Sequence, residues 1–276
     1  MTRRWPLLLP VFALLLVAAV ALAVFAFKDG SGGAGDNSPT SASSGDPSAR
    51  PQLEPQGSVC EGLVSRPDPS APRQFAAQYT KQREVLGIAI VGGGGVSDAA
   101  FDEAEKTILR VFHGNELEAP LAEEGAYVII LEGNQKVIAL PEFACLSGTR
   151  TQSILDHACG VADRADYPVA TVNELDLTGS RKGPCGGLNI LYHELGHLVQ
   201  GWTLDHADYI DIKVLYQQAL DAGKYGRTYA ATNPNEYFAE ATQSYFFHQD
   251  SNEHDRAWLQ KYDPDLYAIL ARVYGD

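Results

Sequence analysis

The segment His193-Glu194-Leu195-Gly196-His197 restricts the fold more than any other part of this 276-residue chain. Two histidines four residues apart lie on one face of an α-helix, so both imidazoles can reach one metal ion. Glu194 then lies over the open coordination position, as in the H-E-x-x-H pattern of metal-dependent hydrolases. Apolar residues recur at helical spacing around the motif, and they are Leu188, Ile190, Leu191, Leu195, Leu198 and Val199. The sequence therefore predicts a buried, zinc-binding helix.

The composition supports a functional interpretation of this motif. With only 7 histidines in the chain, a chance match to the pattern is roughly a one-in-a-hundred event. Single histidines outside such a pattern are more often satisfied structural residues than ligands. This applies to His113, His157, His206, His248 and His254.

A catalytic zinc site needs a third protein ligand besides the two histidines. The metzincin arrangement, with glycine and histidine at positions 200 and 203, is excluded because these positions hold Gln200 and Thr203. His206, together with Asp205 and Asp208, offers ligands soon after the first helix. Nothing in the sequence gives these three residues a defined geometry, so a more distant ligand is the better hypothesis.

A second helix is predicted from position 234, because Asn233 can cap it and Pro234 suits its first turn. Glu236 follows the cap by three residues, so its structural role could be that of a capping-box carboxylate. Glu240 could be an ordinary surface acid. The two glutamates nevertheless share one helix face at i and i+4, and both could point towards the zinc helix.

The chain resembles the catalytic domain of the anthrax lethal factor-like metalloproteases, a gluzincin group that includes the Pro-Pro endopeptidases. The resemblance rests on the motif from His193 to His197 and on a second set of residues, which are Tyr229, Thr232, Asn233, Glu236, Phe238, Ala239, Glu240 and Ala241. It implies that Glu236 completes the zinc ligands with His193 and His197, and that Tyr229 faces the substrate. It also implies that Glu240 supports a zinc ligand from outside the coordination sphere.

These residues predict a zinc endopeptidase. Glu194 is the expected general base, and Tyr229 is the expected hydrogen-bond donor to the oxyanion of the reacting carbonyl. Two alternatives stay open: a catalytically silent zincin-fold domain that binds or regulates a partner, and a zinc hydrolase of non-peptide amides. The presence of Glu194 favours an enzyme, since binding alone does not require this carboxylate. The sequence leaves the substrate and the oligomeric state undetermined.

The amino end is typical of a membrane segment. Arg3 and Arg4 precede 23 largely apolar residues, positions 5–27, which is long enough to span a bilayer with its amino end in the cytoplasm. A cleaved signal peptide is the alternative, since Ala21-Leu22-Ala23 is an acceptable cleavage pattern. The length of the apolar run favours an uncleaved anchor over residues 1–28, with the rest of the chain outside the cytoplasm.

A polar stalk and one domain are predicted beyond this segment. Residues 29–57 are rich in Gly, Ser, Asp and Pro, a composition that cannot bury enough apolar surface to fold. Residues 58–276 suit a single domain. The expected fold class is α+β, a zincin-like metalloprotease domain with a small N-terminal mixed sheet and a mainly helical C-terminal part.

Within this domain, hydrophobic patterns predict strands at residues 85–91, 127–131 and 136–140, and a helix at 97–112 that Ser97 caps. The last two strands would pair, and with Pro141-Glu142-Phe143 they look like the segment that precedes the zinc helix in bacterial members of the family. The glycines at 92–95 lack the Lys-Ser or Lys-Thr of a phosphate-binding loop, so a strand-to-helix turn is expected there.

Cysteines and charge give two further expectations. All four cysteines, Cys60, Cys145, Cys159 and Cys185, follow the apolar segment, and an even number in an exported domain predicts two disulfides. Four cysteines allow three pairings, and the one proposed is Cys145 with Cys159 and Cys60 with Cys185. Residues 29–276 contain 18 basic and 35 acidic residues, a net charge of −17, which argues against nucleic acid as a partner.

Overall fold

The computed structural model describes residues 74–162, 168–247 and 254–275. The predicted anchor and the predicted stalk lie outside these ranges, so both stay predictions. Within the described ranges, every helix is too short or too polar to span a membrane.

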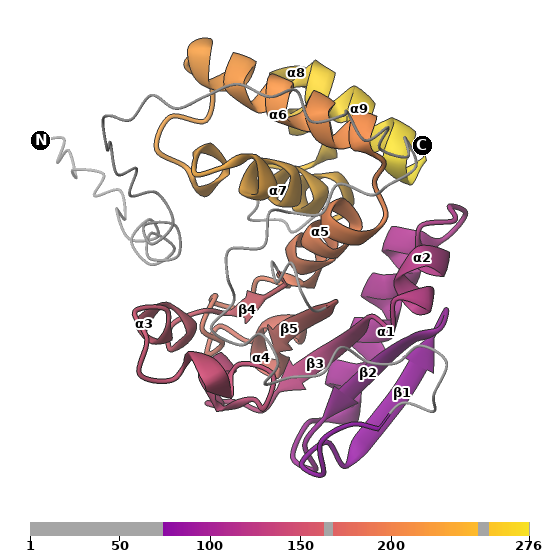
Figure 1. Ribbon diagram of the computed structural model, residues 1–276, viewed down its shortest axis with the longest axis vertical. Helices are drawn as coiled ribbons and strands as arrows, with labels where there is room; N and C mark the ends of the chain where they lie inside the picture. Colours follow the sequence, from indigo (N-terminus) through magenta and orange to yellow (C-terminus); the bar gives the residue numbers. More distant parts are fainter. Residues whose placement is uncertain (1–73, 163–167, 248–253, 276) are drawn as a thin grey trace, which may run out of the picture.

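A five-stranded mixed sheet forms the first half of the described chain (Figure 1). Its strands lie in the order β1-β2-β3-β5-β4, and they are β1 (Lys81–Val85), β2 (Ile88–Gly92), β3 (Tyr127–Leu131), β5 (Val169–Asn173) and β4 (Gly160–Val161). The three central strands run parallel, while β1 and β4 pair antiparallel at the two edges. Every residue of the three central strands is buried, as expected for parallel strands covered on both faces.

Two cores form because side chains alternate across β3. Val128 and Ile130 pack into the larger core beneath the helices, whereas Tyr127, Ile129 and Leu131 pack into a smaller core on the opposite face. The smaller core also encloses polar groups.

Glu142 is a buried polar residue beside this smaller core. It is only 5% exposed, and its carboxylate accepts hydrogen bonds from the hydroxyls of Tyr79 (2.6 Å) and Tyr127 (2.8 Å). These two hydrogen bonds hold the Pro141-Glu142-Phe143 segment against the face of the sheet that carries Tyr127.

The strand predicted at residues 85–91 is confirmed from residue 88 onwards as the buried strand β2, but its start is wrong, because the chain reverses at Leu86 and Gly87. Leu86 and Gly87 both have positive φ, 52° and 75°, and they form a two-residue turn between β1 and β2. Positive φ at both central positions is the requirement of the hairpin turn that matches strand twist. The segment is a hairpin whose first strand begins at Lys81.

The strand at residues 127–131 is confirmed, but the one predicted at 136–140 is wrong. This segment forms the 3₁₀ turn η1 (Val137–Ala139). β3 pairs on one side with β2 and on the other with β5, so both of its edges are already occupied. The buried Val137 and Leu140 pack into the smaller core instead.

Helices cover the sheet and make up nearly all of the second half. The helix predicted at 97–112 is confirmed as α1 (Asp98–Phe112), with the hydroxyl of Ser97 accepting from the amide of Ala100 at 3.3 Å. The remaining helices are α2 (Glu118–Glu123), η2 (Ala144–Leu146), α3 (Gln152–Leu155), α4 (Glu174–Leu177), α5 (Leu191–Trp202), α6 (His206–Asp221), η3 (Tyr229–Ala231), α7 (Pro234–Phe246), α8 (Arg256–Tyr262) and α9 (Pro264–Tyr274). In Figure 1, α5 lies between the sheet and the layer formed by α6, α7, α8 and α9. The α+β class is confirmed.

The predicted disulfide pairing is wrong. Cys159 is bonded to Cys185, with their Cα atoms 5.7 Å apart. Cys145 is also disulfide-bonded. β4 begins directly after Cys159 and pairs with β5, and this pairing brings Cys159 beside the loop that leads into α5. No cysteine in the described ranges is free.

Candidate active site

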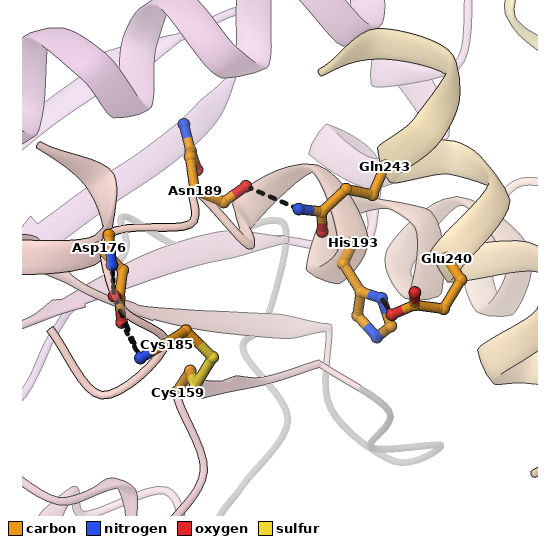
Figure 2. The surroundings of a disulfide bond; sticks show 8 residues. Cys159, Asp176, Cys185, Asn189, His193, Glu240 and Gln243 are labelled. Carbon is orange, nitrogen blue, oxygen red and sulfur yellow. Dashed lines mark hydrogen bonds and ion pairs between the residues drawn. A yellow bond between two sulfur atoms is a disulfide. The ribbon is translucent and has the colours of Figure 1, made fainter. Parts of the chain in front are cut away.

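The start of α5 is held by a buried asparagine. Asn189 is 7% exposed, and its side-chain oxygen accepts from the amide of Leu191 at 3.1 Å. Its side-chain amide donates to the hydroxyl of Thr107 in α1 at 3.0 Å. Gln243 of α7 adds a longer bond to the backbone carbonyl of Asn189, 3.4 Å (Figure 2). Asn189 therefore connects three helices at the point where the metal helix begins.

His193 and His197 project from one face of α5, as their spacing predicts. They are 6% and 8% exposed, and their Nε2 atoms lie 3.1 Å apart. The two rings meet nearly at right angles, at 80°. The two buried Nε2 atoms therefore point towards a common position beside α5.

Glu236 reaches the same place from α7. The side-chain oxygen of Asn233 accepts from the amides of Asn235 (2.8 Å) and Glu236 (3.0 Å), which confirms the predicted cap and places Glu236 in the first turn. Its carboxylate turns towards the histidines: Oε2 lies 3.1 Å from Nε2 of His193 and 3.3 Å from Nε2 of His197.

The three atoms form a nearly equilateral triangle that fits a metal ion. Its sides measure 3.1, 3.1 and 3.3 Å, and neighbouring ligand atoms of a tetrahedral zinc site lie roughly 3.3 Å apart. Oε2 of Glu236 is buried and faces both ring nitrogens at ion-pair distance. A buried carboxylate is costly unless positive charge faces it, which a metal ion between the three atoms would supply. The donor set of two nitrogens and one carboxylate oxygen is one that zinc accepts.

Glu240 contacts the far side of the first histidine. Its Oε1 lies 3.1 Å from Nδ1 of His193 (Figure 2), one helical turn after Glu236. Such a contact keeps the proton on Nδ1 and leaves Nε2 free to bind a metal. Glu240 is more exposed than the other site residues, with 43% of its side chain accessible.

The electrostatics of the site favour a cation. Burial disfavours a charged imidazole, yet the carboxylates of Glu236 and Glu240 hold the pKa of His193 well above its ordinary value. Burial also lowers the pKa of His197, but the nearby carboxylate of Glu236 raises it above its ordinary value. Burial also opposes ionisation of Glu236, but the two imidazoles lower the pKa of its carboxyl. A metal ion would replace these protons.

The two predicted catalytic residues flank the triangle. The half-buried ring of Tyr229, in η3, lies 6.0 Å from the His193 ring, centroid to centroid, and 29° from parallel to it. Glu194 is 5% exposed and points towards β4. A Cβ placed on Gly160 of that strand would lie 3.1 Å from Oε1 of Glu194.

The alternative ligand source is not part of this arrangement. Asp205 caps α6 by accepting from the amide of Asp208 at 2.8 Å, and His206 is an exposed residue of the same turn. Among the described residues, the His193, His197 and Glu236 cluster does not include them. His254 stacks on Trp258, and His157 contacts the carbonyl of Ser153 at 2.8 Å.

Two residues that shape the site, Asn189 and Gly160, are absent from the sequence-based hypotheses, and a third, Gly196, enters them only as a position within the metal motif. Asn189 carries a local signal, an asparagine just before a helix, that could have suggested a cap. The two glycines carry none, because their role is to leave space for residues that are distant in sequence.

This fold and this site define a zincin-like metalloprotease domain. Residues 101–273 match the family model described as "Anthrax toxin lethal factor, N- and C-terminal domain", and the chain belongs to this family. The metal it implies fits the His193, His197 and Glu236 triangle.

A solved structure supports the fold. The PRO-PRO endopeptidase PPEP-2 from Paenibacillus alvei superposes with a TM-score of 0.51 at 21% sequence identity, over 67% of this chain and 97% of the other. At that identity the similarity establishes a shared fold. No curated protein matches the chain.

Proposed function

We propose that the domain is a zinc-dependent endopeptidase. The observation that carries this proposal is the triangle of His193, His197 and Glu236, whose sides of 3.1 to 3.3 Å suit a tetrahedral zinc ion. Membership of the lethal factor family supports a peptidase, and the similar fold of PPEP-2, an endopeptidase, is consistent with it. The substrate is then a peptide or protein.

Each residue of the site has a distinct task in peptide hydrolysis. A zinc ion held by the three ligands would polarise the scissile carbonyl and make water a stronger nucleophile. Glu194 accepts a proton from that water and passes it to the leaving amine. Tyr229 donates a hydrogen bond to the oxygen on which negative charge develops. Glu240 fixes the orientation of the His193 ring through Nδ1.

Glu194→Gln tests the proposal directly. Glutamine has nearly the same size and leaves all three metal ligands in place, but it cannot accept the proton. We expect the variant to retain one zinc per chain and to lose peptide cleavage by several orders of magnitude. The assay is a digest of a broad peptide library, including Pro-Pro sequences, with and without chelator. Wild-type protein that binds zinc but cleaves nothing would favour the binding-module alternative, and cleavage of only non-peptide amides would favour the second alternative.

We also propose that the domain is anchored in a membrane and lies outside the cytoplasm. The apolar segment at residues 5–27 and the basic Arg3 and Arg4 support this orientation. The disulfide chemistry of the domain is consistent with an oxidising compartment. Protease added to intact cells should release a soluble fragment that starts within residues 29–57. Complete protection of the domain would contradict the proposed topology.

A further inference from the structure

We propose that the Cys159–Cys185 disulfide is a positioning element of the active site, which holds strand β4 against the carboxylate of Glu194. Its loss should slow peptide cleavage without releasing the metal. This inference rests on the proposed function, because it assigns the disulfide a role in the reaction of that site.

The disulfide joins two segments that border the metal helix. Cys159 is the residue directly before β4, and Cys185 lies in the loop that leads into α5. Figure 2 shows the disulfide beside Asp176, with His193 and Glu240 on the right of the same view. Both cysteines are half-buried and pack at the edge of the larger core. The position of the disulfide suggests a local constraint.

Gly160 shows how tightly β4 passes the catalytic carboxylate. A Cβ at this position would lie 2.2 Å from the carbonyl oxygen of Thr171, 2.6 Å from Cδ1 of Ile190 and 3.1 Å from Oε1 of Glu194. The first two distances are closer than real Cβ atoms approach, so only glycine fits. β4 therefore occupies a narrow space between β5, the start of α5 and Glu194.

β4 is too short to hold this place reliably by pairing alone. It has two residues, with Gly160 opposite Val172 and Val161 opposite Thr171. Strands of typical length have five or six. The amide of Val161 donates to the hydroxyl of Thr171 at 2.8 Å, and the carbonyl of Cys159 accepts from the amide of Asn173 at 3.2 Å. A covalent link next to such an edge strand restricts its local opening.

Asp176 holds the turn that contains Cys185, the second cysteine of the disulfide. This fully buried carboxylate accepts from the amide of Cys185 at 3.1 Å and from that of Gly187 at 2.8 Å. Gly187 has a positive φ of 87° and packs on the backbone of Gly179. The Cys185 turn is thus rigid, and the disulfide extends this rigidity to β4.

None of the proposed metal ligands lies on the two segments that the disulfide joins. His193 and His197 are on α5 and Glu236 is on α7, whereas the disulfide acts on the strand that faces Glu194. A displaced β4 would leave the general base less well positioned, and misplacement of about 1 Å costs on the order of 100-fold in rate. Loss of the disulfide should therefore change kcat more than metal content.

The test compares two matched double variants of the full chain, residues 1–276. Cys159→Ser/Cys185→Ser removes the link, and Cys60→Ser/Cys145→Ser removes the other two cysteines as a control. For the first variant we expect one zinc per chain, a kcat lowered on the order of 10- to 100-fold, and faster hydrogen exchange at residues 158–162. The control should keep the wild-type kcat and the wild-type exchange of this segment.

Gly160→Ala provides an independent route to the same result. It leaves both cysteines in place but fills the space beside Glu194, so it should lower kcat and retain zinc. Wild-type kcat in Cys159→Ser/Cys185→Ser, or equal losses in both double variants, would overturn the proposal, as would unchanged exchange at residues 158–162. If wild-type protein cleaves no peptide, the proposed function fails. The exchange measurement then decides separately whether the disulfide holds β4.

Discussion

Gly196 of α5 lies against Ala239 of α7, so close that a Cβ on Gly196 would be 3.0 Å from the Cα of Ala239. The same Cβ would lie 3.0 Å from both Cβ and Oγ1 of Thr242. Gly196 is part of the motif from His193 to His197, and Ala239 follows Glu236 by three residues. The close crossing of the two helices is therefore what lets a carboxylate of α7 meet two imidazoles of α5.

Gly196→Ala should weaken both the fold and the metal site. Alanine gains about 1 kcal/mol of helix propensity over glycine, whereas overpacking at a tight contact costs about 1–3 kcal/mol. We expect a net loss of stability and a reduced zinc affinity, because α7 must move away from α5. Thermal unfolding and zinc retention measure the two effects.

Gly201→Ala is the control for this substitution. Gly201 is a half-buried residue of the same helix, and five positions after Gly196 it lies on a different helix face, so alanine there gains helix propensity without facing the same contact. It should retain zinc as wild type does. If Gly196→Ala is as stable as wild type and binds zinc equally well, the close crossing is not what sets the ligand geometry.

Glu236→Gln should empty the metal site. The substitution keeps the shape of the side chain but removes the charge that faces His193 and His197 at 3.1 and 3.3 Å. Zinc content after dialysis against a weak chelator is the measurement. Glu240→Gln, which alters only the contact to Nδ1 of His193, should lower affinity by roughly 10- to 100-fold and no more. Loss of zinc from Glu240→Gln with retention in Glu236→Gln would reverse the ligand assignment.

Much of the site could be predicted because its signals are local. The i, i+4 spacing of the histidines defines one helix face, and Asn233 with Pro234 marks the start of the second helix. Ser97 marks the start of α1 in the same way. These patterns depend on neighbours in sequence, and the structure reproduces each of them.

The features that could not be predicted depend on partners that are distant in sequence. Residues 136–140 have the composition of a strand, but β5 occupies the edge of β3 that they would need. Leu86 adopts positive φ in the hairpin turn, although leucine gives no sign of it. The bond between Cys159 and Cys185 follows from the pairing of β4 with β5, which spacing along the chain does not reveal.

Asp263→Ala should be among the most destabilising substitutions outside the metal site. Asp263 is 2% exposed and accepts from the hydroxyls of Tyr225 (3.0 Å) and Tyr237 (2.7 Å) and from Nζ of Lys224 (3.0 Å). Removal of one member of a buried charged network costs about 3–5 kcal/mol. Denaturant unfolding measures this loss.

Asp265→Ala is the matched control for Asp263. Asp265 is an exposed residue in the first turn of α9, where a negative charge contributes about 0.3–1 kcal/mol through the helix dipole. Its loss should therefore be several-fold smaller. Equal effects of the two substitutions would show that the Asp263 network contributes no more than an exposed helix charge.

Tyr229→Phe tests the role of the Tyr229 hydroxyl as oxyanion donor separately from zinc binding and from the general base. The substitution removes one hydroxyl and preserves the ring that lies 6.0 Å from the His193 ring, so the fold and the zinc content should not change. A lost oxyanion donor costs roughly 100-fold or more in kcat with little change in KM, and the measurement is steady-state cleavage of a peptide found by the library digest. Tyr209→Phe is the control. Tyr209 is a half-buried residue of α6, and its variant should cleave peptide as wild type does. A rise in KM at unchanged kcat would instead make Tyr229 a substrate-binding residue, and wild-type kinetics in Tyr229→Phe would remove the residue from the mechanism.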